Sequence, residues 1–111
     1  MLEKDPFGIC SSEAGAKMDC CKNRVGLVIL AFSRALTEVA KVGTYGANKY
    51  SDDGWLHVPN AESRYTDAML RHLLSEFDDE IDEDTGLLHA AQVAWNALAR
   101  LHFILLRRLN G

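Results

Sequence analysis

The sequence has few of the residues that cross-link a small domain or bind structural zinc. Cysteine occurs three times, at Cys10, Cys20 and Cys21, and no two of them have the Cys-x-x-Cys spacing of a zinc site. Because an odd number of cysteines leaves one thiol over in any pairing, we expect reduced thiols, as in a cytosolic protein. The sequence therefore argues against a disulfide-stabilised secreted domain.

Long hydrophobic stretches are also missing. The longest apolar run, residues 25–32, contains Gly26 and is far shorter than the stretch of about 20 residues that spans a membrane. The N-terminus, MLEKDPFGIC, lacks the basic region followed by an apolar stretch that marks a signal peptide. We therefore expect a cytoplasmic protein with no membrane partner.

Clustered positive charge and several familiar motifs are absent as well. The net charge is -4, and no run of lysine and arginine offers a surface to nucleic acid. The sequence contains no GxxxxGK[ST] phosphate loop, GxSxG, HExxH or zinc-deaminase signature. An EF-hand loop counted from Asp78 fails, because Glu83 stands where the loop needs glycine and His89 where it needs glutamate.

The patterns that are present predict helices. Apolar residues recur at three- and four-residue steps in residues 25–42, 60–77 and 87–109, and Asn60 is suited to cap the second of these helices. The first helix is apolar almost all round, so three helices do not close a core by themselves. We predict an all-α bundle of three principal helices with short extra helices, completed by homo-oligomerisation into a dimer or tetramer. Residues 1–24 are predicted to be an N-terminal arm with a basic segment, and residues 25–111 the helical domain.

The connection between the first two predicted helices, residues 45–59, is rich in turn residues but also carries Tyr45, Tyr50 and Trp55. Aromatic residues in such a loop can pack on a base or on a neighbouring subunit. They can equally cap the core, and composition alone does not separate these interpretations.

The segment around which the chain is organised is an acidic run after the second predicted helix. Seven of the nine residues 76–84 are acidic, and such a concentration of like charge is costly unless cations, water or a partner offset it. A solvated loop is one interpretation and a divalent metal site is the other, because hard cations take oxygen ligands. The helix that follows begins with His89, Gln92 and Asn96, which fall within about 60° of one another around its axis. A polar strip beside an acidic loop favours a site wall.

This composition suits metal-assisted cleavage of a phosphoanhydride. A metal would neutralise a polyphosphate and activate a water, while lysine and arginine hold the phosphate oxygens. Because the carboxylates alone would repel a triphosphate, substrate binding should require the cation.

Three blocks of sequence carry a family resemblance. They are TYGANKYSDDGW, RYTDAMLRHLL and DDEIDEDTGLLHAAQVAWNAL, preceded by KMDCCKNR. In this order, over roughly residues 15–106, they resemble the phage-type dATP/dGTP diphosphohydrolases, MazZ-like members of the all-α nucleoside triphosphate pyrophosphohydrolase (MazG-like) superfamily. Gln92 stands where the family has a second histidine, and Asp78 and Asp79 stand where it has Gly-Glu. Either Asp79 or Glu80 is therefore the matching acid.

The resemblance implies hydrolysis of dGTP and/or dATP to the monophosphate and pyrophosphate, with Mg²⁺ or Mn²⁺, in a bacterial or phage-infected cytoplasm. The acids that it suggests as metal ligands are Glu38, Asp67, Asp79, Glu80, Asp82 and Asp84. The candidate catalytic residues are His72, Asp79, Glu80 and His89. The candidate substrate contacts are Lys22, Lys49, Tyr50, Trp55, Arg64, Arg71 and Asn96.

Two other hypotheses remain open. A non-catalytic helical module could use the acidic run to dock a basic partner, in which case metal and nucleotide should not stabilise the fold. A house-cleaning pyrophosphohydrolase for a modified nucleotide would share the chemistry and differ only in its base pocket.

Overall fold

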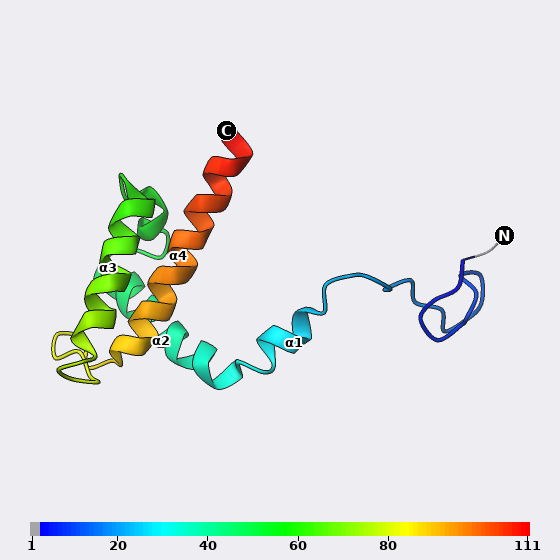
Figure 1. Cartoon of the computed structure of the whole chain (residues 1–111), viewed down its shortest axis with the longest axis horizontal. Helices are drawn as coiled ribbons and strands as arrows, with labels where there is room; N and C mark the ends of the chain where they lie inside the picture. The colour runs from blue at the N-terminus through cyan, green and yellow to red at the C-terminus, as the bar shows by residue number, and fades with distance from the viewer. Residues whose placement is uncertain (1–2) are drawn as a thin grey trace. The chain divides into compact units, whose positions relative to one another are not determined.

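The computed structural model describes residues 3–111, and the regular structure of this part of the chain is helical (Figure 1). The helices are α1 (Val25–Ile29), α2 (Ser33–Lys49), the short 3₁₀ helix η1 (Gly54–His57), α3 (Ala61–Ser75) and α4 (His89–Asn110). Extended pairing in the described residues is limited to two isolated bridges, Lys4 with Cys10 and Ile81 with Leu88. The all-α prediction is confirmed. None of these helices is both long enough and apolar enough to cross a bilayer.

The chain divides into two compact units, Met1–Ala31 and Phe32–Gly111. In the first unit, the buried carboxylate of Asp5 organises a loop. Its Oδ1 accepts hydrogen bonds from the backbone N–H groups of Phe7 and Ile9 at 3.0 and 2.9 Å, and its Oδ2 accepts one from Lys17 at 3.0 Å. These bonds, the one from Ile9 above all, lower the pKa of Asp5. Part of the predicted N-terminal arm therefore has an ordered fold of its own.

The first predicted helix, residues 25–42, is wrong in both its continuity and its end. The chain forms two helices there, and α2 continues through Gly43 and Gly46 to Lys49. Glycine in a helix interior costs up to about 1 kcal/mol relative to alanine, which is why the sequence suggested a stop. At Gly43 the close approach of Trp95 offsets this cost, since a Cβ there would lie 3.3 Å from Trp95 Nε1.

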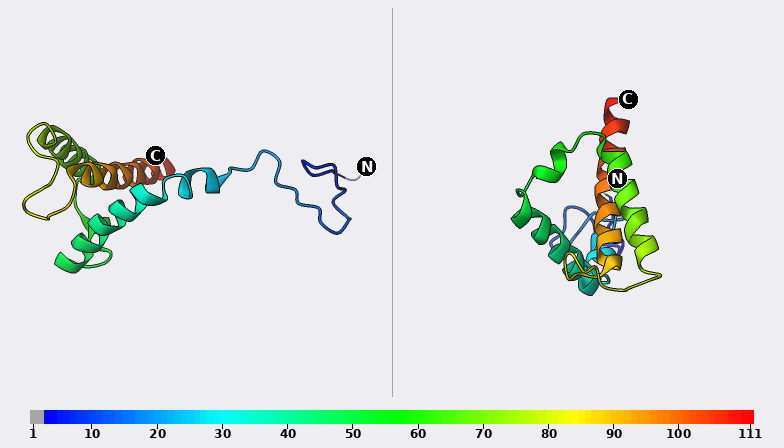
Figure 2. Two further views of the ribbon diagram at one scale, coloured as in Figure 1. Left: turned by 90° about the horizontal axis from the view of Figure 1, so that it is seen from below. Right: turned by 90° about the vertical axis from the view of Figure 1, so that its left-hand side faces the viewer.

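In the second unit, α3 and α4 run antiparallel and side by side (Figure 2), and α2 packs against α4. Two arginines of α4 make polar contacts with α3. Arg100 Nε donates to Thr66 Oγ1 at 2.8 Å, and the Arg107 guanidinium donates to both carboxylate oxygens of Glu62 at 2.7 and 3.1 Å. The result is a helical hairpin with a third helix laid against one of its members.

The capping position of α3 was predicted correctly, but the physical reason for the prediction was wrong. Asn60 is the N-cap residue, as predicted, but its side chain makes no capping hydrogen bond. Its backbone instead adopts the left-handed conformation, with φ of 53°, which asparagine tolerates better than most residues. Asn60 thus contributes to the turn before α3 through its backbone conformation and not through a capping hydrogen bond.

Aromatic rings do much of the packing in the second unit. Trp55 of η1 packs edge-on against Trp95, His102 and Phe103 of α4, with ring centroids 5.0 to 5.9 Å apart. The hydroxyl of Tyr65 donates to the backbone oxygen of Trp55 at 2.7 Å and so holds η1 against α3. The connection between α2 and α3 is therefore fixed in place.

Aliphatic burial within the described residues is slight. The buried hydrophobic residues are three alanines, Ala61, Ala91 and Ala99, and no side chain in this part of the chain is completely buried. Four large residues along α3 and its end, at three- and four-residue steps, are exposed to solvent: Leu70, Leu73, Leu74 and Phe77. A helical hairpin of this kind leaves apolar surface uncovered.

Candidate functional site

The first turns of α4 bury polar side chains where a helix of this kind would usually bury apolar ones. His89, Gln92 and Asn96 are only 8%, 6% and 7% exposed, which places the predicted polar strip on the inner face of the helix. Asn96 Nδ2 donates to the backbone oxygen of Gln92 at 2.7 Å. Since buried polar groups need hydrogen-bond partners, the first turns of α4 must form polar contacts with neighbouring groups.

The acidic turn in front of α4 closes on itself around Asp82. The N–H of Asp82 donates to the backbone oxygen of Leu87 at 2.9 Å, and the N–H of Gly86 donates to that of Asp82 at 2.7 Å. Gly86 has a φ of 72°, a conformation in which a side chain would be strained. The turn therefore depends on the Thr85-Gly86 pair that ends the acidic run.

The carboxylate of Asp82 is held by three donors. Gln92 Nε2 donates to Oδ2 at 3.0 Å, Thr85 Oγ1 lies 3.3 Å from the same oxygen, and the N–H of Asp84 donates to Oδ1 at 3.0 Å. Burial raises the pKa of this carboxyl, but the hydrogen bonds from Gln92, Asp84 and Thr85 outweigh burial and leave the pKa below its ordinary value. Asp82 is thus fixed in position as a carboxylate.

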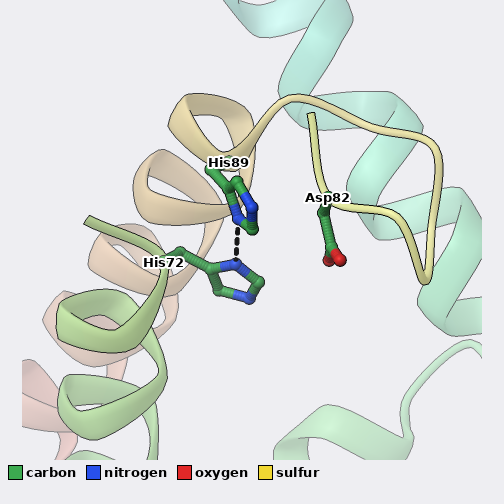
Figure 3. Close-up of side chains that lie close together, drawn as sticks. All are labelled: His72, Asp82 and His89. Carbon is green, nitrogen blue, oxygen red and sulfur yellow. Dashed lines mark hydrogen bonds between the residues drawn. The ribbon is translucent and has the colours of Figure 1, made fainter. Parts of the chain in front are cut away.

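Two histidines meet beside Asp82 (Figure 3). His72 near the end of α3 and His89 at the start of α4 have their Nδ1 atoms 2.9 Å apart, in a hydrogen bond whose donor depends on the tautomer. Burial is the main cause that lowers the pKa of His72; nearby Asp82 opposes the shift, while His89 and Arg71 add to it. His72, His89 and Asp82 each offer one ligand atom, and these atoms lie within 4.8 Å of one another. We call these three residues the His-Asp triad.

A cleft of about 1080 Å³ opens beside the triad. Several segments of the second unit line it: the end of α2 with the loop to η1, η1 itself with Val58, one side of α3, the acidic turn at Thr85, and the first half of α4. His72 belongs both to this lining and to the triad, and Thr85 and Gln92, which hold Asp82, line it too. The cleft and the triad are therefore adjacent parts of one region.

The cleft gathers cations and aromatic rings. Lys49, Arg64 and Arg71 supply the positive charge, and Asp52 and Asp67 supply carboxylates. Its aromatic lining consists of Tyr45, Tyr50, Trp55, Tyr65 and Trp95. Lys49 Nζ lies 5.2 Å from the centroid of the Tyr50 ring, close enough for a cation–π contact. Such a cleft can hold an anion with an attached planar group.

Most of the predicted substrate contacts lie together in this cleft. Those that line it are Lys49, Tyr50, Trp55, Arg64, Arg71 and Asn96. Lys22 lies in the first unit, which is a separate compact body. Of the two histidines predicted to be catalytic, His72 lines the cleft, and His89 belongs to the triad but not to the cleft lining.

The predicted metal ligands are dispersed. Asp82 belongs to the triad and Asp67 lines the cleft, whereas Glu38 on α2 pairs with Lys41 at 2.8 Å. Asp79, Glu80 and Asp84 are exposed, and within the described residues they are not part of the cleft lining or the triad. Asp79 Oδ1 accepts a hydrogen bond from the N–H of Ile81 at 3.0 Å, which helps to shape the turn.

Sequence reasoning did not name Tyr65, Trp95 or Thr85 as site residues, and it placed Gln92 only in the polar strip of the last helix. Tyr65 and Trp95 fall at helical steps among apolar residues, a pattern that also describes an ordinary core. Thr85 and Gln92 hold Asp82, and the signal for them was weak: a polar residue before the glycine of the turn and a polar residue one helical turn after His89. Hydrogen-bonding capacity, which glutamine retains where histidine was expected, is the property that the structure uses.

The sequence also matches a known protein family. Residues 12–110 match the family model described as dATP/dGTP diphosphohydrolase, N-terminal. The chain belongs to this family. Searches of curated proteins and of solved structures returned no match.

Membership of the dATP/dGTP diphosphohydrolase family confirms the resemblance seen in the sequence blocks. It supports a hydrolase whose substrate is a nucleoside triphosphate, and it implies dependence on a metal ion. The donor set fits such an ion, because the triad offers two imidazoles and a carboxylate from three different segments.

Proposed function

We propose that this chain hydrolyses dGTP and/or dATP to the monophosphate and pyrophosphate, with Mg²⁺ or Mn²⁺. The observation that carries the proposal is the cleft, in which three cationic side chains and five aromatic ones lie beside a His-Asp triad. Its volume of about 1080 Å³ is at the upper end of ligand-binding clefts, which run to about 1,000 Å³. A nucleoside triphosphate is a ligand of this size and chemistry.

The cations of the cleft are suited to the phosphates. Arg64 and Arg71 lie seven residues apart on α3 and both line the cleft, so one helix presents two guanidinium groups. Guanidinium groups bind phosphate oxygens through paired hydrogen bonds, and Lys49 adds a point charge from the end of α2. These side chains would hold the triphosphate and stabilise the negative charge that develops as pyrophosphate leaves.

The aromatic wall is suited to the base. Tyr65 is held by its hydrogen bond to Trp55, and Trp95 is held by edge contacts to both rings. Tyr50 is largely exposed and available to a ligand. Asn96, with amide donor and acceptor groups, would add polarity beside these rings. Rings fixed in this way can stack on a purine without losing much freedom on binding.

In this reaction a water molecule forms a bond to the α-phosphorus. The bond from the α-phosphorus to the oxygen that bridges the α- and β-phosphates breaks, and pyrophosphate leaves. The metal, when bound, would offset phosphate charge and lower the pKa of the attacking water. The three cations of the cleft outnumber its two carboxylates, Asp52 and Asp67, and the metal would offset the charge of the triphosphate that these cations do not balance.

The direct test incubates purified protein with each of the four dNTPs and either MgCl₂ or MnCl₂, and resolves the products by ion-exchange chromatography. We expect dGMP or dAMP with equimolar pyrophosphate, and complete loss of product in excess EDTA. Release of dGDP with phosphate, or no product from either purine dNTP, contradicts the proposal.

A pair of arginine variants tests the site assignment. Arg71→Ala should lower kcat/KM at least tenfold, because a charge-assisted hydrogen bond contributes about 1.5–3 kcal/mol. Arg108→Ala, at the exposed end of α4, is the matched control and should leave kcat/KM unchanged. Equal effects of the two substitutions would contradict a role for the cleft.

We also propose that the chain functions as a homo-oligomer. The exposed residues Leu70, Leu73, Leu74 and Phe77 form an apolar stripe along α3 and just past its end, and Phe77 is 85% exposed. An apolar stripe of this kind can pair with its own copy about a two-fold axis. A second copy would supply the aliphatic burial that the described residues lack.

A further inference from the structure

We propose that His72, Asp82 and His89 form a binding site for one first-row transition-metal ion, such as Mn²⁺, Co²⁺ or Zn²⁺, in preference to Mg²⁺. The inference deepens the proposed function by naming the cofactor class of its site, and it rests on that function only for its biological use. It departs from the carboxylate-only ligand set that the family resemblance implies, because two of the three ligands are imidazoles.

The positions of the two histidines fit joint coordination. Two nitrogen ligands bound at about 2.1 Å lie about 3.0 Å apart in an octahedral site, where they form a right angle, and about 3.4 Å apart in a tetrahedral site. The two Nδ1 atoms are 2.9 Å apart, so they could share a metal with little movement. The hydrogen bond between them would be replaced by two metal–nitrogen bonds.

The third ligand comes from the acidic turn. Figure 3 shows the Asp82 side chain extending from its loop to one side of the two imidazoles, and its ligand atom lies within 4.8 Å of theirs. A carboxylate has about four acceptor positions. Gln92 and Thr85 donate to Oδ2 and only the Asp84 N–H donates to Oδ1, so Oδ1 keeps an acceptor position for a metal.

The surroundings of Asp82 are those of a ligand held in place. Metal-binding carboxylates are commonly fixed by hydrogen bonds from neighbouring side chains and backbone. Here a buried glutamine, a threonine and a backbone N–H converge on a single carboxylate, while the other acids of the run remain exposed. Asp82, the one acid of the run that belongs to the triad, is thus the acid that these three donors hold in place.

The donor atoms decide which metal is favoured. Mg²⁺ prefers oxygen ligands and retains its water, whereas imidazole favours the later first-row ions. Affinity for a given nitrogen-containing site rises from Mn²⁺ to Co²⁺, and Mg²⁺ should bind most weakly because it prefers oxygen ligands. His72 also lines the cleft, so a bound ion would lie beside the space assigned to the triphosphate.

Cobalt titration of the whole chain gives a direct test without substrate. We expect Co²⁺ to bind with one-to-one stoichiometry, seen as visible absorption bands and by calorimetry, and at least tenfold more tightly than Mg²⁺. His72→Ala and Asp82→Asn should each weaken Co²⁺ binding at least tenfold. His57→Ala, at an exposed histidine of η1, is the control and should bind Co²⁺ as the wild type does.

A measurement on the wild type keeps the test sound if a variant fails to fold. In nuclear magnetic resonance spectra, Co²⁺ should shift or broaden the imidazole signals of His72 and His89 more strongly than those of His57 and His102. Absence of Co²⁺ binding, equal affinity for Mg²⁺, or strongest effects at His57 or His102 would overturn the inference.

The outcomes also separate this site from the proposed function. Co²⁺ binding at the triad without dNTP hydrolysis would leave the metal site standing and remove the enzyme proposal. Hydrolysis of dNTPs by a chain that binds Co²⁺ at another site would support the enzyme proposal and remove the metal site at the triad.

Discussion

Gln92 connects the polar face of α4 with the acidic turn. Its Nε2 atom donates to Asp82 at 3.0 Å and lies 3.2 Å from the hydroxyl of Thr85, whose oxygen accepts a hydrogen bond from the N–H of Leu87 at 3.1 Å. A single side chain therefore holds both the carboxylate and the turn that carries it. Because Gln92 is 6% exposed, water cannot readily take over its role.

Substitution of Gln92 tests this role at the scale of one residue. Gln92→Met keeps the approximate volume but removes the donor, and should lower the free energy of unfolding by about 1–3 kcal/mol, since Asp82 then loses one of its three donors. Urea denaturation at neutral pH measures the change. Thr37→Val removes an exposed hydroxyl on α2 and serves as the control, with an expected change below about 0.5 kcal/mol. A change of that small size in Gln92→Met would show that the contact is not needed.

At the scale of elements, α2 and α4 approach closely at one glycine. A Cβ on Gly43 would lie 3.3 Å from Trp95 Nε1, whereas a Cβ on Gly46, one turn later in the same helix, would meet no atom within 4 Å. Glycine destabilises the interior of a helix relative to alanine at both positions, but close packing requires it only at Gly43. The two positions therefore form a matched pair.

Alanine and valine scans of the pair should give different results. Gly46→Ala should raise the free energy of unfolding by about 0.5–1 kcal/mol through helix propensity. Gly43→Ala should gain less than this, and Gly43→Val should lose about 1–3 kcal/mol by overpacking against Trp95. Thermal and urea denaturation provide the measurement. Equal gains from the two alanine variants would mean that α2 does not contact Trp95 in this way.

The ends of α3 and α4 are linked by a pH-sensitive ion pair. The Arg107 guanidinium, through its hydrogen bonds to the carboxylate, lowers the pKa of Glu62 below its ordinary value of 4.5. A carboxyl whose pKa is lower in the folded state stabilises the fold above its unfolded pKa, and this contribution disappears as the pH falls through the folded pKa. The contribution is small because Arg107 is exposed to water and Glu62 is partly exposed.

Glu62→Gln should therefore reduce stability slightly at pH 7 and have less effect as the pH falls below 4.5. Melting curves of the wild type and the variant, recorded between pH 3 and pH 7, should converge at the acidic end. A difference that is constant over this range would show that the ion pair is not the cause. Glu83→Gln, in the exposed acidic run, is the control.

At the scale of the whole molecule, the second unit has polar contacts and aromatic rings in its interior and leucines on its surface. Leu74 is 66% exposed and Phe77 is 85% exposed. Apolar surface of this kind is usually covered by another chain or by another part of the same one. Covering it with a second copy would give the hairpin the burial that its own helices do not provide.

Analytical ultracentrifugation tests the assembly. The wild type should sediment as a dimer or tetramer of the 12.3 kDa chain at micromolar concentration, and Leu74→Glu should shift it toward the monomer by placing a charge in the apolar contact. Leu109→Glu, beyond the α3 stripe, should leave the assembly unchanged. A monomeric wild type, or equal dissociation by both variants, would contradict the proposed interface.

Periodicity along the sequence was enough to predict the helical class, the approximate bounds of α3 and α4, and the polar strip of His89, Gln92 and Asn96. These features depend on residues within a few turns of one another, and the helix repeat places such residues on one face. The cleft residues Lys49, Arg64 and Arg71 were named from sequence blocks, but their common location was not visible there.

Tertiary structure alone decided which groups meet. His72 and His89 are 17 residues apart, and only the antiparallel packing of α3 on α4 brings their Nδ1 atoms within 2.9 Å. Likewise, seven acids look equivalent in the run, yet the closure of the turn at Gly86 directs only Asp82 toward the histidines. The path of a loop depends on contacts with other elements, whereas a helix face depends on local spacing, and this difference separates what could be predicted from what had to be seen.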